Sequence, residues 1–112
     1  GEDDLDGEAW VERARERYLS PQHLAGRARG CAAVALGTEI SRLGSAEREA
    51  FGAELDRLIE AMAERIGGPD ARPRALKLLS EWAGALMLAR AVEAPELADE
   101  ILAAARTSDR QG

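Results

Sequence analysis

The segment from Pro73 to Val92 constrains the fold most, because its residue pattern changes halfway along. An α-helix turns by about 100° per residue, which brings Arg74, Lys77 and Glu81 to one side. The same side continues with Gly84, Ala85, Leu88 and Val92. A second side, formed by Leu76, Leu79, Ala83 and Leu86, faces the core of the domain. The second half of this helix is therefore apolar nearly all round, and such a helix is buried on all sides.

A second subunit is the economical way to bury this helix, because a small domain has few helices to surround it. Gly84 and Ala85 would let another helix approach closely. With the helix that begins near Pro95, each subunit would contribute two helices to a four-helix bundle across a two-fold axis. The predicted dimer interface comprises Gly84, Ala85, Leu88, Val92, Leu97 and Ile101. The alternative is that these residues are internal core, packed between neighbouring helices of one chain.

The rest of the chain also predicts helices, separated by glycine and proline. The expected helices run from about Asp6 to Leu19, Cys31 to Leu43, Ser45 to Ile66, Pro73 to Val92, and Pro95 to Ala105. The connector before Cys31 has room for one helical turn, and Ser45 is expected to be the N-cap of the third helix. Alanine and leucine dominate the hydrophobic residues, and no alternating strand pattern occurs. The sequence predicts an all-α fold of five to six helices in a single domain over residues 1–112.

The charge of the chain argues against several classes of function. It has 21 acidic and 15 basic residues, for a net charge of −6, and an acidic chain repels nucleic acid. A polybasic cluster for anionic membranes, a membrane span and a signal peptide are not visible. The single cysteine suits a reducing compartment, so we expect a cytoplasmic protein. One cysteine and one histidine cannot form a Cys/His zinc site, and no cofactor is expected.

Large side chains on apolar helix faces are the candidates for a ligand pocket, because such pockets are mostly apolar with a few polar groups. The candidates are Trp10, Tyr18, Cys31, Thr38, Phe51, Met62 and Trp82. The alternative for each of them is ordinary core packing. A redox role for Cys31 would require an exposed thiol with a lowered pKa, whereas a buried thiol is inert. His23, at a turn, is a candidate for pH sensing or ligand binding; the alternative is a structural or solvated histidine.

Arg90 projects to the same side as Leu79 and Leu86, so it is expected to be buried and to form a structural ion pair. Its candidate partners are Glu39, Asp99 and Glu100. The alternative is that its long stem reaches water. The other acidic residues follow solvated helix faces, and no nucleophile motif or phosphate-binding loop occurs. The sequence therefore predicts no enzymatic activity.

Several phrases of the sequence resemble one family, the TetR-family transcriptional regulators. Residues 18–23 (YLSPQH) are similar to the end of the first long helix of the sensor domain, and residues 30–36 (GCAAVAL) to the helix that follows it. Residues 83–92 resemble the penultimate helix of the family, and residues 95–106 the last. These phrases occur in the order and spacing of the family, from about Trp10 to Arg106.

The resemblance implies a two-domain repressor whose C-terminal domain dimerises through its last two helices and holds a small effector among the others. The effector is expected to be small and apolar. The N-terminal helix-turn-helix domain of the family would precede Gly1, so DNA would be bound only through that part. A different interpretation is a dimerisation or adaptor module without a small-molecule ligand.

Overall fold

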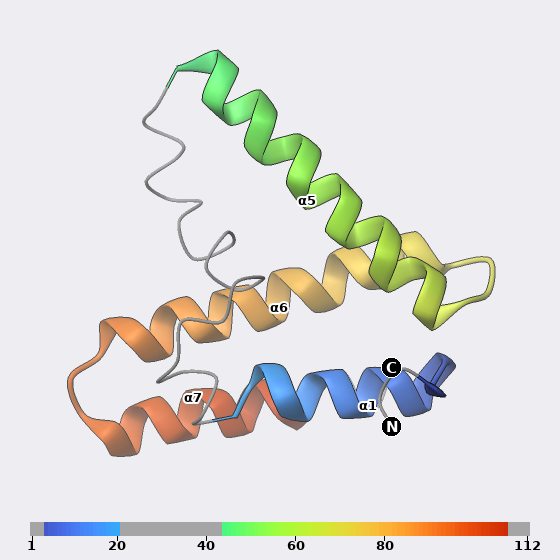
Figure 1. Cartoon of the computed structure of the whole chain (residues 1–112). Helices are drawn as coiled ribbons and strands as arrows, with labels where there is room; N and C mark the ends of the chain where they lie inside the picture. Colours follow the sequence, from blue (N-terminus) through green and yellow to red (C-terminus); the bar gives the residue numbers. More distant parts are fainter. Residues whose placement is uncertain (1–3, 21–43, 108–112) are drawn as a thin grey trace.

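The computed structural model describes residues 4–20 and 44–107, and the elements longer than one turn in these ranges are α-helices (Figure 1). They are α1 (Gly7–Tyr18), α5 (Ser45–Ile66), α6 (Ala71–Ala91) and α7 (Pro95–Thr107). The all-α prediction is confirmed for these ranges, which contain no strand. The helix expected at Cys31–Leu43, the connector before it and His23 lie outside the described residues.

The helix ends follow the glycine and proline signals closely. α5 ends at Ile66, because Gly67 adopts φ 74° and ψ 166°, a conformation that is essentially restricted to glycine. The prediction for the start of α5 was wrong in one detail: Gly44 is the N-cap, without a side-chain cap hydrogen bond, and Ser45 is the first helical residue. α6 begins at Ala71, which leaves Pro73 in the first turn, where its missing N–H costs nothing.

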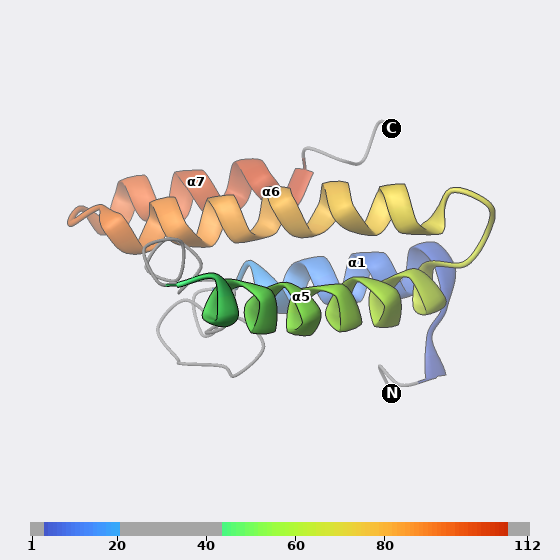
Figure 2. The same ribbon diagram turned by 90° about the horizontal axis from the view of Figure 1, so that it is seen from above.

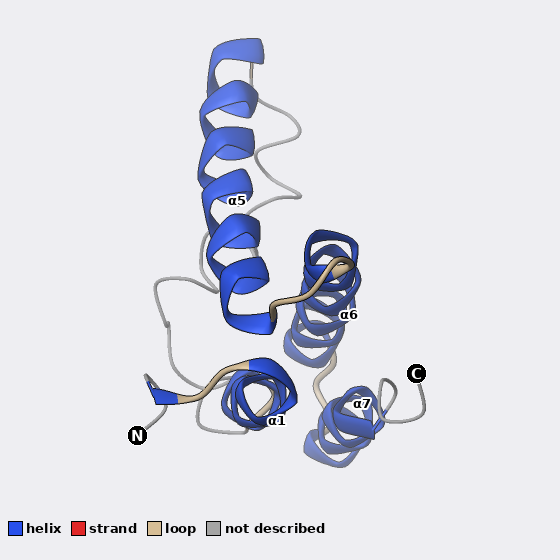
Figure 3. Ribbon diagram, turned by 90° about the vertical axis from the view of Figure 1, so that its right-hand side faces the viewer, coloured by secondary structure: helices blue, strands red, loops and turns tan. Residues whose placement is uncertain are grey.

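The helices form two layers, with α6 and α7 in one and α1 and α5 in the other (Figure 2). In Figure 3, α1, α6 and α7 are seen nearly end-on, whereas α5 is seen from the side. α5 therefore crosses the other three steeply. Its C-terminal half carries its buried residues, Ile59, Met62 and Ile66, while residues 44–50 are all exposed.

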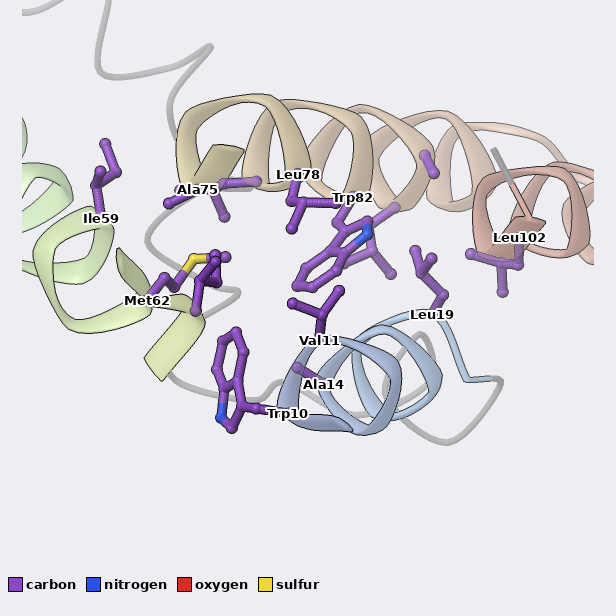
Figure 4. Packing of buried hydrophobic residues seen from close by; sticks show 14 of the residues in the cluster. Trp10, Val11, Ala14, Leu19, Ile59, Met62, Ala75, Leu78, Trp82 and Leu102 are labelled. Atoms are coloured by element: carbon purple, nitrogen blue, oxygen red, sulfur yellow. The ribbon is translucent and has the colours of Figure 1, made fainter. Parts of the chain in front are cut away.

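The core is centred on Trp82, whose side chain is completely buried. Trp82 points from α6 toward Val11 of α1, and Met62 approaches from α5 (Figure 4). The buried side of α6 is formed by Ala75, Leu78, Leu79, Trp82, Ala85, Leu86 and Ala89. From α7, Ala98 and Leu102 complete the core. One cluster of buried side chains thus joins all four helices.

The buried side of α6 is rotated from the one predicted. At about 100° per residue, it is turned by roughly 80° toward Trp82. Leu76, expected in the core, is 42% exposed, whereas Ala85, expected at the dimer interface, is 7% exposed within the single chain. The same rotation leaves Arg90 at the edge of the buried side, where it is exposed. The expected burial of Arg90 is therefore wrong for the single chain, in which its stem reaches solvent.

The buried cation of the described ranges is Arg15, which is 1% exposed. It lies four residues after Val11 and therefore on the buried side of α1. Its Nη1 donates a hydrogen bond of 2.7 Å to Oε2 of Glu12, whose side chain is 43% exposed. This contact brings the carboxylate of a partly solvated residue to a desolvated guanidinium, as a buried charge requires.

Other arginines connect helices across the surface of the bundle. Nη1 of Arg106 in α7 donates a 2.6 Å hydrogen bond to the carbonyl oxygen of Leu19, at the end of α1. Arg72 of α6 pairs with Asp56, at 2.6 Å, and with Glu60, both in α5. These hydrogen bonds to Asp56 and Glu60 raise the pKa of the Arg72 guanidinium. Arg74 of α6 forms a two-pronged pair with Glu8 of α1.

Alanine substitutions at Gly52, inside α5, and at Gly67, directly after its last residue, should change the free energy of unfolding in opposite directions. Gly67→Ala places a side chain in a glycine-only conformation and should lower the free energy of unfolding by about 1–3 kcal/mol. Gly52 lies inside the helix, and a Cβ there meets nothing within 4 Å, so Gly52→Ala should raise it by up to about 1 kcal/mol. Urea unfolding followed by circular dichroism measures both. If both substitutions raised the free energy of unfolding, or both lowered it, the assignment of the end of α5 would be contradicted.

Arg106→Ala should lower the free energy of unfolding by about 1–2 kcal/mol, because it removes a charge-assisted hydrogen bond to the carbonyl oxygen of Leu19 at the end of α1. Arg57→Ala is the control, since Arg57 is 66% exposed and pairs with Glu54 of its own helix. Its effect should stay within about 0.5 kcal/mol. Equal effects of the two substitutions in urea unfolding would show that the contact between α7 and α1 adds no stability.

Candidate ligand pocket

A cavity of about 200 Å³ lies between α1, α5 and α6. α1 contributes Trp10, Arg17 and Tyr18, and α6 contributes Trp82. α5 contributes Leu58, Ala61, Met62 and Arg65. For comparison, an engineered apolar cavity of about 150 Å³ holds benzene. The pocket is therefore large enough for a small substituted ring.

Helical spacing explains why these residues meet. Leu58, Ala61, Met62 and Arg65 stand at positions i, i+3, i+4 and i+7 of α5, which share one side of a helix. Arg17 stands seven residues after Trp10 in α1, so it too falls on the side of that tryptophan. Trp82 is the only contribution of α6 among the lining residues, and it is also the centre of the core. The pocket is thus a continuation of the core toward solvent.

The inner part of the pocket is aromatic. Trp82 is completely buried, Met62 is 4% exposed and Trp10 is 9% exposed. The rings of Tyr18 and Trp82 have centroids 5.5 Å apart and are tilted by 33°. Figure 4 shows Met62 extending from α5 into the space between α6 and α1, above the ring of Trp10. Flat rings and a polarisable thioether are surfaces on which an aromatic ligand packs well.

The outer part of the pocket carries two cations from different helices. Arg17 of α1 is exposed, and its guanidinium carbon lies 6.0 Å from the centre of the Tyr18 ring. Arg65 of α5 is 33% exposed; its Nη1 donates a 3.1 Å hydrogen bond to the carbonyl oxygen of Leu5 and lies 3.6 Å from Oδ1 of Asp6. The lining residues that the structure describes include no aspartate or glutamate.

Of the predicted ligand residues, the structure brings Trp10, Tyr18, Met62 and Trp82 together in this pocket. Phe51 is partly buried in the first half of α5 and is not a lining residue. Cys31 and Thr38 lie outside the described residues. The sequence analysis missed Arg17 and Arg65, because it selected only large apolar or weakly polar side chains. Their spacing of seven residues from Trp10 and Leu58 places each on the pocket side of its helix, but the same spacing is common on solvated helices, so the sequence carries no distinctive signal for them.

The predicted interface residues separate into different environments. Leu88 and Leu97 are 54% and 44% exposed. Val92 and Ile101 are partly buried against the core, and Ala85 belongs to it. At Gly84 an added Cβ meets nothing within 4 Å, so no described segment packs closely on that position. Only part of the predicted surface is therefore available to another molecule.

Other kinds of site receive no support from residues 4–20 and 44–107. These ranges contain no group of three or more histidine, cysteine, aspartate or glutamate residues that could hold a metal ion. None of their helices is long and apolar enough to cross a membrane. Nε1 of Trp82 is buried and has no hydrogen-bond partner in the same part of the chain.

Comparisons with protein-family models, curated proteins and solved structures found no match to this chain. The resemblance to TetR-family regulators therefore rests on the sequence phrases alone. It remains a prediction about the family of the chain.

Proposed function

We propose that this chain is the effector-sensing and homodimerising domain of a TetR-like transcriptional repressor. The observation that carries the proposal is the pocket, because Trp10, Tyr18, Met62 and Trp82 come together there from three helices. A cavity that continues an aromatic core toward solvent is suited to a small, mostly apolar ligand. The order of the sequence phrases provides the link to the repressor family.

Exposed leucines on the last two helices support the dimer. Leu88 lies three residues before Ala91, the last residue of α6, and Leu97 is the third residue of α7. Large apolar side chains gathered near one loop are typical of a surface that another protein covers. In this proposal the occupant is a second copy of the chain, because burying α6 and α7 of both copies makes the four-helix bundle.

In the proposed repressor, the pocket controls the distance between two DNA-binding domains. An effector changes that distance only if it binds the two arrangements with different free energies. A different candidate function is a dimerisation or adaptor module with no small-molecule ligand. The exposed leucines support that function equally well, so ligand binding is the property that separates the two.

A small apolar ligand should raise the midpoint of thermal unfolding, because it binds the folded state only. At a concentration about 100 times its Kd, the stabilisation is about 2.7 kcal/mol. The test is a thermal-shift series with substituted benzenes and short fatty acids. Ala61→Phe places a ring among the lining residues and should abolish the shift. Ala53→Phe, on an exposed part of the same helix that does not line the pocket, should preserve it. Absence of any shift would favour the adaptor module.

Leu88→Glu should weaken the dimer, because it places a charge in an apolar interface. We expect the Kd of the dimer to rise at least tenfold. Leu76→Glu is the matched control, since Leu76 is also exposed on α6 but lies about 120° away around the helix. Light scattering behind a sizing column should give twice 12.0 kDa for the unaltered chain and for the control. A monomeric unaltered chain would refute the dimer.

A further inference from the structure

We infer that the pocket binds a small aromatic carboxylate, with its ring among the tryptophans and its carboxylate at Arg65 and Arg17. This inference rests on the proposed function and specifies the chemical class of the effector. It follows from the opposite character of the two parts of one cavity. The inner residues are aromatic or apolar, and the outer ones include two guanidinium groups.

The charge at the pocket is opposite to that of the chain. The chain as a whole has a net charge of −6, yet the described lining residues include two arginines and no acidic residue. An acidic protein repels anions at long range, so a local pair of arginines is what lets an anion bind at this place. Arginine presents N–H donors in a planar fork that matches both oxygens of a carboxylate.

The aromatic walls alone would also suit a cation, because tryptophan and tyrosine faces attract positive charge. The two guanidinium groups argue against that ligand, since they would repel it in a partly desolvated cavity. A neutral aromatic compound would gain the ring contacts and leave the arginines without a new partner. The carboxylate is the class that uses both parts of the pocket.

Size limits the ligand further. The cavity of about 200 Å³ exceeds the roughly 150 Å³ of a cavity that holds benzene by only a small margin. A single ring with a short alkyl group and a carboxylate fits this volume, whereas a multi-ring compound does not. A long-chain fatty acid would extend far outside the cavity.

The existing contacts of Arg65 permit this binding. Asp6, its carboxylate partner at 3.6 Å, has a side chain that is 77% exposed. An ion pair that is this exposed contributes at most about 1 kcal/mol, so a ligand carboxylate in a less solvated position can replace Asp6. The carbonyl oxygen of Leu5 accepts from the same guanidinium. The ligand would therefore act directly on the contact between α5 and the segment in front of α1.

The test compares para-ethylbenzoate with its neutral counterpart, para-ethylbenzyl alcohol, and its cationic one, para-ethylbenzylammonium. The chain has two tryptophans, Trp10 and Trp82, and both line the pocket. Tryptophan fluorescence, excited at the red edge of the indole band, therefore reports occupancy of this site. The carboxylate should bind at least tenfold more tightly than the alcohol, and added salt should reduce this difference.

Substitutions of the two arginines test whether they cause the preference for the carboxylate over the alcohol. Arg65→Gln and Arg17→Gln should each weaken carboxylate binding about tenfold or more while leaving alcohol binding nearly unchanged. Arg57→Gln, an exposed arginine of α5 that does not line the pocket, is the matched control and should change neither. Circular dichroism confirms that each variant is folded. Leu5 and Asp6 contact Arg65 of α5, and the Arg17→Gln variant leaves both contacts in place. It therefore tests the charge even if Arg65→Gln reduces stability.

The outcomes separate the inference from the proposed function. Equal binding of the alcohol and the carboxylate, or an unchanged affinity in both arginine variants, overturns the inference and leaves an effector pocket in place. Preferential binding of the ammonium compound does the same. If none of the three probes binds, the inference that the pocket binds an aromatic carboxylate is overturned. If the wider series of apolar ligands also gives no thermal shift, the effector-sensing function fails as well.

Discussion

The burial of Trp82 is the constraint on which the rest of the structure depends. This side chain is completely buried at the junction of α6 with α1, and it forms both the centre of the core and one wall of the pocket. Tryptophan is the largest apolar side chain, so burying Trp82 contributes more to stability than burying any other side chain of α6. Once it is directed inward, the rotation of α6 is fixed. Leu76 and Leu88 are then directed outward, and Arg90 falls at the edge.

Electrostatic contacts hold the helices in the arrangement that the core sets up. Arg72, Arg74 and Arg106 each reach a different helix from their own. The ion pairs of Arg72 and Arg74 involve exposed or partly exposed side chains, so each adds little stability alone. These contacts restrict how the helices are oriented, because the N–H donors of a guanidinium fit a partner in few geometries. The apolar core supplies most of the stability, and the arginines select one packing of the four helices.

Much of the fold could be predicted from the sequence, because glycine and proline act locally. α5 and α7 begin where Ser45 and Pro95 stand, and Gly67 ends α5 by its own backbone conformation. The rotation of α6 could not be predicted in the same way. A helix that is apolar nearly all round has no unique inner side in its pattern, so the choice between Leu76 and Trp82 is made by volumes in the other helices. The burial of Arg15 was missed for another reason: it lies four residues after Val11, but arginine is almost never fully buried, so its type argued against a core position.

The pocket was predictable to the extent that it is a part of the core. Large side chains on apolar helix faces converge on the interior, and this rule alone selects Trp10, Tyr18, Met62 and Trp82. It cannot select Arg17 and Arg65, because a charged residue seven positions from an aromatic one is ordinary on a solvated helix. Only the crossing of α1 and α5 places the two arginines at the same opening. The chemical character of the pocket therefore depends on tertiary structure, while its location follows from the apolar faces of the helices.

In the proposed repressor, Arg65 would link the chemical character of the pocket to regulation. Its guanidinium is part of the pocket wall and also holds the Leu5 carbonyl in front of α1. Any occupant that interacts with Arg65 changes the free energy of this contact, and the same change must appear in the affinity for the occupant, because coupling between two sites is reciprocal. In the proposed repressor, the segment before α1 would lead toward the DNA-binding domain. A single side chain shared between pocket and segment is then sufficient for coupling, without a larger rearrangement of the core around Trp82.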